Sequence, residues 1–257
     1  MPEFPVFLHL CPVFIAINAV FMVLTEIKKG QTGTGLLIEN DGYVSLDMPE
    51  NKILKEAFGI EGPGQISAKD LPRPFVVSAV FQKFGIENAN GRIYPEDVLR
   101  RAVDKYMANI EDRRGYGECN HPSESSIDLG RLAMNIVELH WEGHTLVGKM
   151  EIPITDGFRN LGIVSTLADM IAQWLISGLK IGVSSRGLGS VTKQFNKLIV
   201  GDDYEIVCWD VVAQPSTPLA FIGMQDKDIA PYVESEKKKG EKLNENKFEK
   251  FDKWLLK

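Results

Sequence analysis

Short segments rich in β-branched and aromatic residues constrain the fold of this chain most. Such segments favour strands, and turn residues between them favour antiparallel pairing. Residues 96–108 and 158–177 instead carry apolar side chains at three- and four-residue steps, which predicts two helices. We therefore predict an α+β fold, an antiparallel β-barrel decorated by helices. The predicted strands are residues 75–84, 132–139, 145–152 and 180–184, followed by a hairpin over residues 197–212.

Turn residues indicate how these segments connect. The run Trp-Glu-Gly-His at residues 141–144 predicts a hairpin between two strands, and Gly-Asp-Asp at residues 201–203 predicts the turn of the last hairpin. Gly178 is placed to cap the second helix. The glycine-punctuated run at residues 185–190 predicts a turn directly after the strand that ends at Ser184.

Composition limits the classes of function. The chain has 257 residues, of which 44% are hydrophobic, enough for one sizeable core. Its formal charge of −6 provides no basic surface for nucleic acid, so we predict no nucleic-acid partner. The three cysteines form no Cys-x-x-Cys pair. We therefore predict no metal and no cofactor, in a reducing compartment.

The predicted domain covers residues 75–233. Residues 1–74 are predicted to precede it as an apolar N-terminal segment followed by a removable lead-in. The lead-in is expected to be loosely structured, because residues 28–74 are rich in Gly, Asp, Glu and Pro. Residues 234–257 form a charged tail with one apolar stripe. This tail is either a solvated helix or a detachable segment that binds a partner.

The apolar run at residues 4–24 has three interpretations. It lies upstream of the true start at Met22, it is a removable or partner-binding segment, or it is a membrane anchor. The run contains two prolines and a histidine, and neither a basic residue before it nor a small-residue cleavage site marks a secretory signal. We favour the first interpretation, because the chain from Met22 onward is typical of a soluble protein, and we expect no membrane partner.

Two stretches combine reactive side chains with glycines. The first, Gly-Tyr-Gly-Glu-Cys-Asn-His-Pro at residues 115–122, offers His121 as a general base, because imidazole titrates near neutral pH. The second, Gly-Val-Ser-Ser-Arg-Gly-Leu-Gly at residues 182–189, offers Ser184 and Ser185 as nucleophiles. A lone loop histidine is more often structural, and serine pairs are common at strand ends. Since side chains alternate along a strand, only one serine can face His121.

His140 and His144 suggest a metal site only superficially. A zinc metalloprotease helix requires His-Glu-x-x-His, with both ligands on one helical face. Here the order is His-Trp-Glu-Gly-His, in a segment with the pattern of a hairpin turn. We therefore predict no metal at these histidines.

Three motifs, taken together, resemble the prohead core proteases of large tailed phages. They are Asn-Ala-Asn-Gly-Arg-Ile-Tyr-Pro at residues 88–95, Gly-Glu-Cys-Asn-His-Pro at residues 117–122 and the Ser-Ser-Arg-Gly motif within residues 182–190. Their order and spacing agree with that family over residues 75–218. The resemblance implies a serine endopeptidase of prohead maturation, with a helix-wrapped barrel similar to that of herpesvirus capsid proteases.

The resemblance also assigns roles. It implies that His121 is the base and Ser184 the nucleophile. Asp210 lies on a later strand where the family tends to carry an acid, and it would orient the imidazole. Glu118, three residues before His121, is the rival for that role. By analogy with the capsid proteases, the backbone N–H groups around Arg186 and Gly187 would form the oxyanion hole.

The implied partners are phage scaffold or core proteins and the major capsid protein precursor, with self-association, inside the prohead in the host cytoplasm. The family is described as cutting after a glutamate preceded two residues earlier by Leu or Ile. Three such triplets end at Glu26, Glu39 and Glu245, which suggests autocleavage. The alternatives are a catalytically inactive scaffold or capsid-assembly protein with the same fold, and an unrelated soluble hydrolase.

Overall fold

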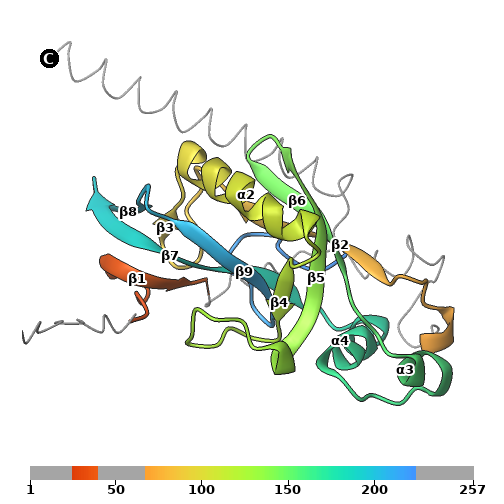
Figure 1. Ribbon diagram of the computed structural model, residues 1–257. Helices are drawn as coiled ribbons and strands as arrows, with labels where there is room; N and C mark the ends of the chain where they lie inside the picture. The colour runs from red at the N-terminus through yellow and green to blue at the C-terminus, as the bar shows by residue number, and fades with distance from the viewer. Residues whose placement is uncertain (1–24, 40–66, 224–257) are drawn as a thin grey trace, which may run out of the picture.

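The computed structural model describes residues 25–39 and 67–223, which form two β-sheets and three α-helices (Figure 1). Five strands make the first sheet, in which β7 lies at the centre. They are β1 (Gly33–Ile38), β7 (Gly182–Gln194), β8 (Lys197–Val200) and β3 (Arg92–Ile93), with β9 (Glu205–Val212) also paired to β7. The second sheet has the order β2 (Val76–Lys83), β6 (Thr145–Glu151), β5 (Leu132–Glu142) and β4 (Tyr116–Glu118).

The α+β class is confirmed, but the described strands do not form the single closed barrel that we predicted. Their ladders divide into two sheets, and the strand pairing between these sheets is limited to isolated bridges. Cys119, after β4, bridges Val211 of β9 on one side. On the other side Phe221 bridges Gly182 of β7, and Ile222 bridges Ala79 of β2. Single bridges leave the junctions without a continuous ladder, so each sheet keeps its own edges.

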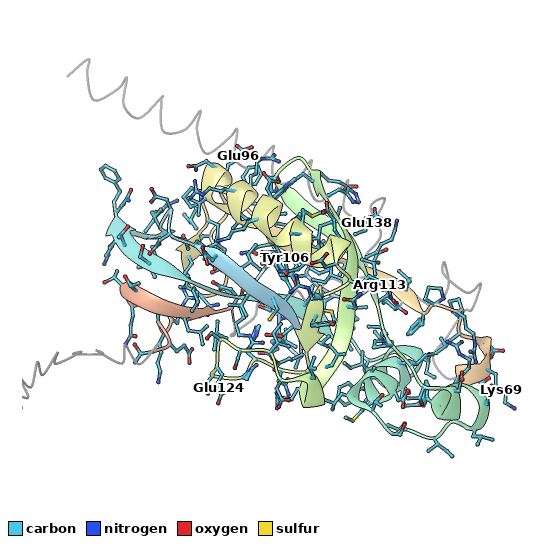
Figure 2. All side chains as sticks on the ribbon, viewed as in Figure 1. Lys69, Glu96, Tyr106, Arg113, Glu124 and Glu138 are labelled. Carbon is cyan, nitrogen blue, oxygen red and sulfur yellow. The ribbon has the colours of Figure 1, made fainter. Side chains whose placement is uncertain are left out.

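Helix α2 (Glu96–Glu111) covers the region where the two sheets meet (Figure 1). Pro95 precedes it, and the apolar side chains predicted from the periodicity face inward. Tyr106 points from α2 into the core (Figure 2), where its ring packs edge-on against Trp209 of β9 at 5.1 Å between centroids. Phe81 of β2 packs on the same indole at 5.6 Å. One tryptophan therefore joins the helix and both sheets.

The predicted helix at residues 158–177 is wrong as a single element. The structure has two helices, α3 (Asp156–Leu161) and α4 (Leu167–Ile176). Gly162 ends the first in the left-handed region at φ 70°, and the Thr166 hydroxyl accepts the Asp169 N–H to begin the second. Gly178 follows α4 at φ 81°, so the predicted cap is at the expected place. Periodicity continued across the break and concealed these two local signals.

Local patterns predicted the middle of the chain correctly. The hairpin of β5 and β6 turns at Gly143, which has φ 58°, as the sequence indicated. Strand β2 and helix α2 also lie where they were predicted, with α2 three residues longer.

The glycine-rich turn predicted at residues 185–190 is also wrong, because these residues continue strand β7. Their glycines allow close approach: a Cβ at Gly187 would lie 2.4 Å from the Tyr204 ring. The hairpin predicted for residues 197–212 is wrong as well, since β8 and β9 both pair with β7 and not with each other. Ser184 therefore lies inside a long strand and not at a strand end.

Part of the segment expected to be a loose lead-in forms strand β1, whose Leu36, Leu37 and Ile38 are buried. The boundaries 1–74, 75–233 and 234–257 otherwise stay a prediction. The apolar run at residues 4–24 and the charged tail lie outside the described residues. Within the described residues no helix is long and apolar enough to cross a membrane.

Candidate active site

His121 and Asp210 form a buried pair. The His121 Nδ1 atom lies 2.7 Å from the Asp210 Oδ2 atom, and both side chains are at most 1% exposed. An ionised carboxylate can only accept a hydrogen bond, so this contact places a proton on Nδ1. The His121 Nε2 atom is then an acceptor, and among the described residues it has no hydrogen-bond partner. An oriented imidazole with a free Nε2 is the arrangement required of a general base.

The loop before His121 is fixed against strand β9. Asn120 takes the left-handed conformation at φ 62°, which Asn tolerates better than most residues. Its N–H donates to the Val211 carbonyl at 2.8 Å, and the Glu118 N–H donates to Asp210 Oδ1 at 2.9 Å. Strand β4 can approach this closely because position 117 is a glycine: a Cβ there would lie 2.2 Å from the Trp209 carbonyl oxygen.

Ser184 lies directly opposite Asp210 in the ladder between β7 and β9. Directly opposite residues project from the same face of a sheet, so Ser184 shares the face that carries the His121–Asp210 pair. Ser185 is opposite Trp209, whose indole is in the core. The two serines therefore lie on opposite faces, as strand alternation predicted, and Ser184 is the one on the face of Asp210.

A buried arginine completes this face. The Arg186 guanidinium contacts Asp210 Oδ2 at 3.0 Å and Glu118 Oε1 at 3.2 Å, and all three side chains are fully buried. Burial would lower the pKa of Arg186, but the neighbouring Cys208 and Asp210 raise it above its ordinary value. Burial and the Asp210 charge raise the pKa of the Cys208 thiol well above its usual range. The arginine is therefore a permanent buried cation.

Glu118, the rival acid, does not contact the imidazole among the contacts described. Its carboxylate accepts the Asp128 N–H at 2.7 Å and contacts Arg131 Nε at 3.3 Å as well as Arg186. Two cations and one backbone N–H thus occupy it. Its geometry fits a role in holding the loop of residues 118–131.

The Ser184 hydroxyl does not donate to His121 in this structure. It donates to the main-chain carbonyl of Glu39, the residue that follows β1. The Glu39 N–H in turn donates to the Ser185 carbonyl at 3.2 Å. Glu39 therefore covers Ser184, which has 0% exposed surface.

Arg186 and Gly187, predicted for the oxyanion hole, lie in β7 with a partner strand on each side. In a regular strand, consecutive N–H groups point toward opposite neighbours. A register shift lies between these two residues, and such an irregularity redirects N–H groups. Their part in an oxyanion hole stays a prediction.

Sequence reasoning missed the surroundings of Glu39. The motif at residues 88–95 contributed to the family resemblance but received no role, and Glu39 was noted only as the end of a triplet. In the structure, donors from that motif and from Ser216 surround the Glu39 carboxylate. The polar residues of the motif at residues 88–95, to which no role was assigned, were the signal that could have indicated a partner such as Glu39.

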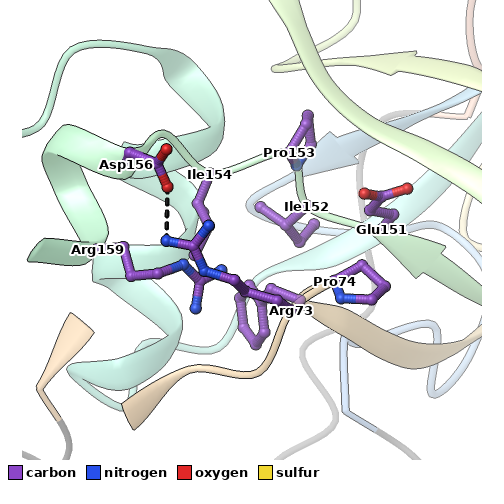
Figure 3. A pocket seen from close by; sticks show the side chains of 9 residues that line it. Arg73, Pro74, Glu151, Ile152, Pro153, Ile154, Asp156 and Arg159 are labelled. Atoms are coloured by element: carbon purple, nitrogen blue, oxygen red, sulfur yellow. Dashed lines mark hydrogen bonds and ion pairs between the residues drawn. The ribbon is translucent and has the colours of Figure 1, made fainter. Parts of the chain in front are cut away.

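Other candidates lie apart from this site. A pocket beside α3 is lined by Arg73, Glu151 and Arg159 among others, and an ion pair of 2.6 Å joins Arg73 to Asp156 at its rim (Figure 3). None of the predicted site residues lines it. His140 lies on the β5–β6 hairpin near Glu138 and Glu142, and no group of three metal-ligating side chains occurs in the described ranges.

A buried acid–imidazole pair with a serine on the same face of a sheet is the combination found in hydrolases that use a serine nucleophile. The comparisons with known proteins agree with that class. The family model described as prohead core protein serine protease matches residues 36–233, and the chain belongs to this family. It is a protease that acts in phage capsid maturation, and family membership does not favour the inactive alternative.

Two relatives illustrate the match. The chain is 29% identical over 188 residues to the prohead core protein protease of Enterobacteria phage T4, which covers 68% of this chain and 85% of that protein. It also resembles the solved structure of the bacteriophage T4 capsid assembly protease, gp21, with a TM-score of 0.52 and 24% identity, over 70% of this chain and 98% of that one. The second likeness supports the fold.

Proposed function

We propose that this chain is a serine endopeptidase in which Ser184 is the nucleophile, His121 the general base and Asp210 the acid that orients the base. The observation that carries the proposal is the 2.7 Å contact between His121 and Asp210 on the face that also carries Ser184. The family name, which specifies a serine protease, supports the same type of nucleophile.

The proposed reaction has two steps, formation of an acyl-enzyme on Ser184 and its hydrolysis by water. His121 Nε2 takes the Ser184 proton while the serine oxygen attacks the substrate carbonyl, and the imidazolium then protonates the leaving amine. Asp210 holds the proton on Nδ1 and stabilises the imidazolium. Water then releases the acyl group by the same route in reverse. We assign the N–H groups of Arg186 and Gly187 to the negative oxygen, because the irregularity between them lies two residues beyond Ser184.

Asp210 suits the orienting role better than Glu118. Asp210 contacts Nδ1 directly, whereas the contacts of Glu118 are with Arg131, Arg186 and a backbone N–H. The Arg186 guanidinium lies 3.0 Å from Asp210 Oδ2, so the acid beside the imidazole has a buried cationic partner. The arginine thereby helps to hold the carboxylate in position against the imidazole.

The proposed substrates are scaffold or core proteins and the major capsid protein precursor, cleaved inside the prohead within the host cytoplasm. The names of the T4 relatives, a prohead core protein protease and a capsid assembly protease, support this setting. Self-association within the prohead belongs to the same proposal. We further propose that the two sheets, which meet through bridges on both sides, correspond to the barrel of herpesvirus capsid proteases.

The adjacent serines provide a matched test. We expect Ser184→Ala to lower kcat/KM on a scaffold-protein substrate by about 10⁴-fold or more, because the covalent step needs this hydroxyl. Ser185→Ala removes the same group one position away but on the core face, and we expect it to stay within about tenfold of the parent. Equal activity of Ser184→Ala and the parent enzyme would exclude this nucleophile.

A further inference from the structure

Strand β1 lies along the strand of the proposed nucleophile in the way that an extended peptide adds to a sheet edge. It pairs antiparallel with β7 from Gly33 opposite Val191 to Ile38 opposite Arg186. In Figure 1 β1 forms the outer strand on that side of β7. Strand addition is a common way for proteins to bind extended peptides, with main-chain hydrogen bonds for affinity and side-chain pockets for specificity.

Glu39, the residue that follows β1, lies at the point where the chemistry would occur. Its carbonyl oxygen accepts the hydrogen bond from Ser184 Oγ, and its N–H pairs with Ser185. A carbonyl in contact with the nucleophilic hydroxyl occupies the position of the residue on the acyl side of a scissile bond. A strand that served only to complete the sheet would not require this contact.

The Glu39 side chain fills a buried pocket of donors. Asn88 and Asn90 each donate to its Oε2 atom at 2.6 Å, and Ser216 donates at 3.1 Å. Arg92 donates to Oε1 at 2.9 Å, with both charged side chains at most 2% exposed. Tyr94 also donates to Oε1.

The pocket matches a carboxylate and rejects its neutral isostere. Burial alone would raise the pKa of Glu39, but the Arg92 charge and the hydrogen bonds of Tyr94 and Asn90 lower it below its ordinary value. The described contacts to the two oxygens all come from donors. A glutamine in this position would direct an NH₂ group at donors and leave Arg92 without a counter-charge.

On the basis of the proposed function, we infer that residues 88–94 and Ser216 form the subsite that selects a glutamate next to the scissile bond, and that β1 occupies this subsite in cis as a self-blocking strand. A substrate peptide must displace β1 from β7 before its own carbonyl can reach Ser184. The fraction of enzyme with β1 displaced then sets the apparent affinity for substrates.

Two variants that act on β1 test the blocking role. Glu39→Gln weakens the binding of β1 to β7 by removing the charge that fills the pocket. Gly35→Ala weakens the same strand away from the pocket, because a Cβ at Gly35 would lie 2.2 Å from the Thr25 carbonyl oxygen that contacts β1. For a fluorogenic peptide with glutamate before the scissile bond, we expect each full-length variant to lower KM by about tenfold. Thermal unfolding identifies a variant that fails to fold, and the KM of the remaining folded variant then tests the blocking role of β1.

The subsite is tested with two peptides that differ only in Glu or Gln before the scissile bond. We expect the parent enzyme to prefer the Glu peptide, and Tyr94→Phe, which removes one donor to the carboxylate, to lower the Glu/Gln ratio of kcat/KM by about tenfold. Glu39→Gln leaves the pocket residues in place, so its ratio should equal that of the parent. An unchanged ratio in Tyr94→Phe would overturn the subsite.

Failure of this inference differs from failure of the proposed function. If Ser184→Ala retains activity, the nucleophile assignment is wrong. If Ser184→Ala is inactive but both folded β1 variants keep the parent KM, the enzyme is a serine protease and only the self-blocking role is wrong.

Discussion

Replacing Asp210 with Asn removes one charge and leaves the shape of the side chain almost unchanged. In the structure Asp210 Oδ1 accepts the Glu118 N–H at 2.9 Å, so the amide oxygen of Asn would keep that position. The amide NH₂ would then occupy the place of Oδ2, 2.7 Å from His121 Nδ1 and 3.0 Å from Arg186 Nε. A donor facing Nδ1 forces the imidazole proton to Nε2, where it blocks acceptance of the Ser184 proton.

The magnitude follows from losing the correct tautomer. The corresponding change in a well-studied serine protease lowers kcat by about 10⁴-fold, or roughly 5.5 kcal/mol at 1.36 kcal/mol per tenfold. The free energy of unfolding should fall by less than this loss in catalysis, because Arg186 keeps its contact with Glu118 at 3.2 Å. Breaking a buried ion pair outright costs about 3–5 kcal/mol, and we expect a smaller loss here.

Steady-state cleavage of a glutamate-containing peptide measures the catalytic effect, and chemical denaturation measures the free energy of unfolding. Glu118→Gln is the matched control, since it also neutralises a buried carboxylate beside Arg186 but leaves the His121–Asp210 pair intact. We expect it to retain far more activity than Asp210→Asn. The reasoning is refuted if Asp210→Asn keeps more than about a tenth of the parent activity, or if Glu118→Gln loses as much.

Two further predictions concern β1 and the strand that precedes His121. Glu39 has a folded-state pKa below its ordinary value of 4.5, so its contribution to stability is complete above that value and is lost as the pH falls through the folded pKa. Hydrogen exchange, corrected for intrinsic rates, should therefore show β1 losing protection below about pH 4.5 before β6 does; simultaneous loss would contradict this. We expect Gly117→Ala to destabilise the protein by about 1–3 kcal/mol, because its Cβ would lie 2.2 Å from the Trp209 carbonyl oxygen. Gly157→Ala, in α3 with only an ordinary contact at 3.7 Å, is its control and should be neutral or slightly stabilising in thermal melts; equal losses would rule out the steric argument.

Prediction from the sequence worked where local signals decide structure. The apolar periodicity of α2 and the turn glycine of the β5–β6 hairpin act over a few residues. Prediction from the sequence failed at β7, because glycine occurs both in turns and in strands where another residue packs closely against the backbone. Gly187 and Gly189 were interpreted as turn residues, but they serve the close approach of Tyr204, a residue that lies more than a dozen positions later. Periodicity across residues 158–177 likewise concealed the helix break at Gly162.

The sequence by itself determined the family, because the motifs around His121 and Ser184 are contiguous and specific. Strand alternation also determined that only one of the two serines could face the imidazole. Only the tertiary structure decided that Asp210 and not Glu118 contacts His121, and that Glu39 covers Ser184. The physical reason is separation along the chain: His121 and Asp210 are 89 positions apart, and Glu39 and Ser184 are 145 positions apart. Their contacts therefore depend on strand register, which no local pattern encodes.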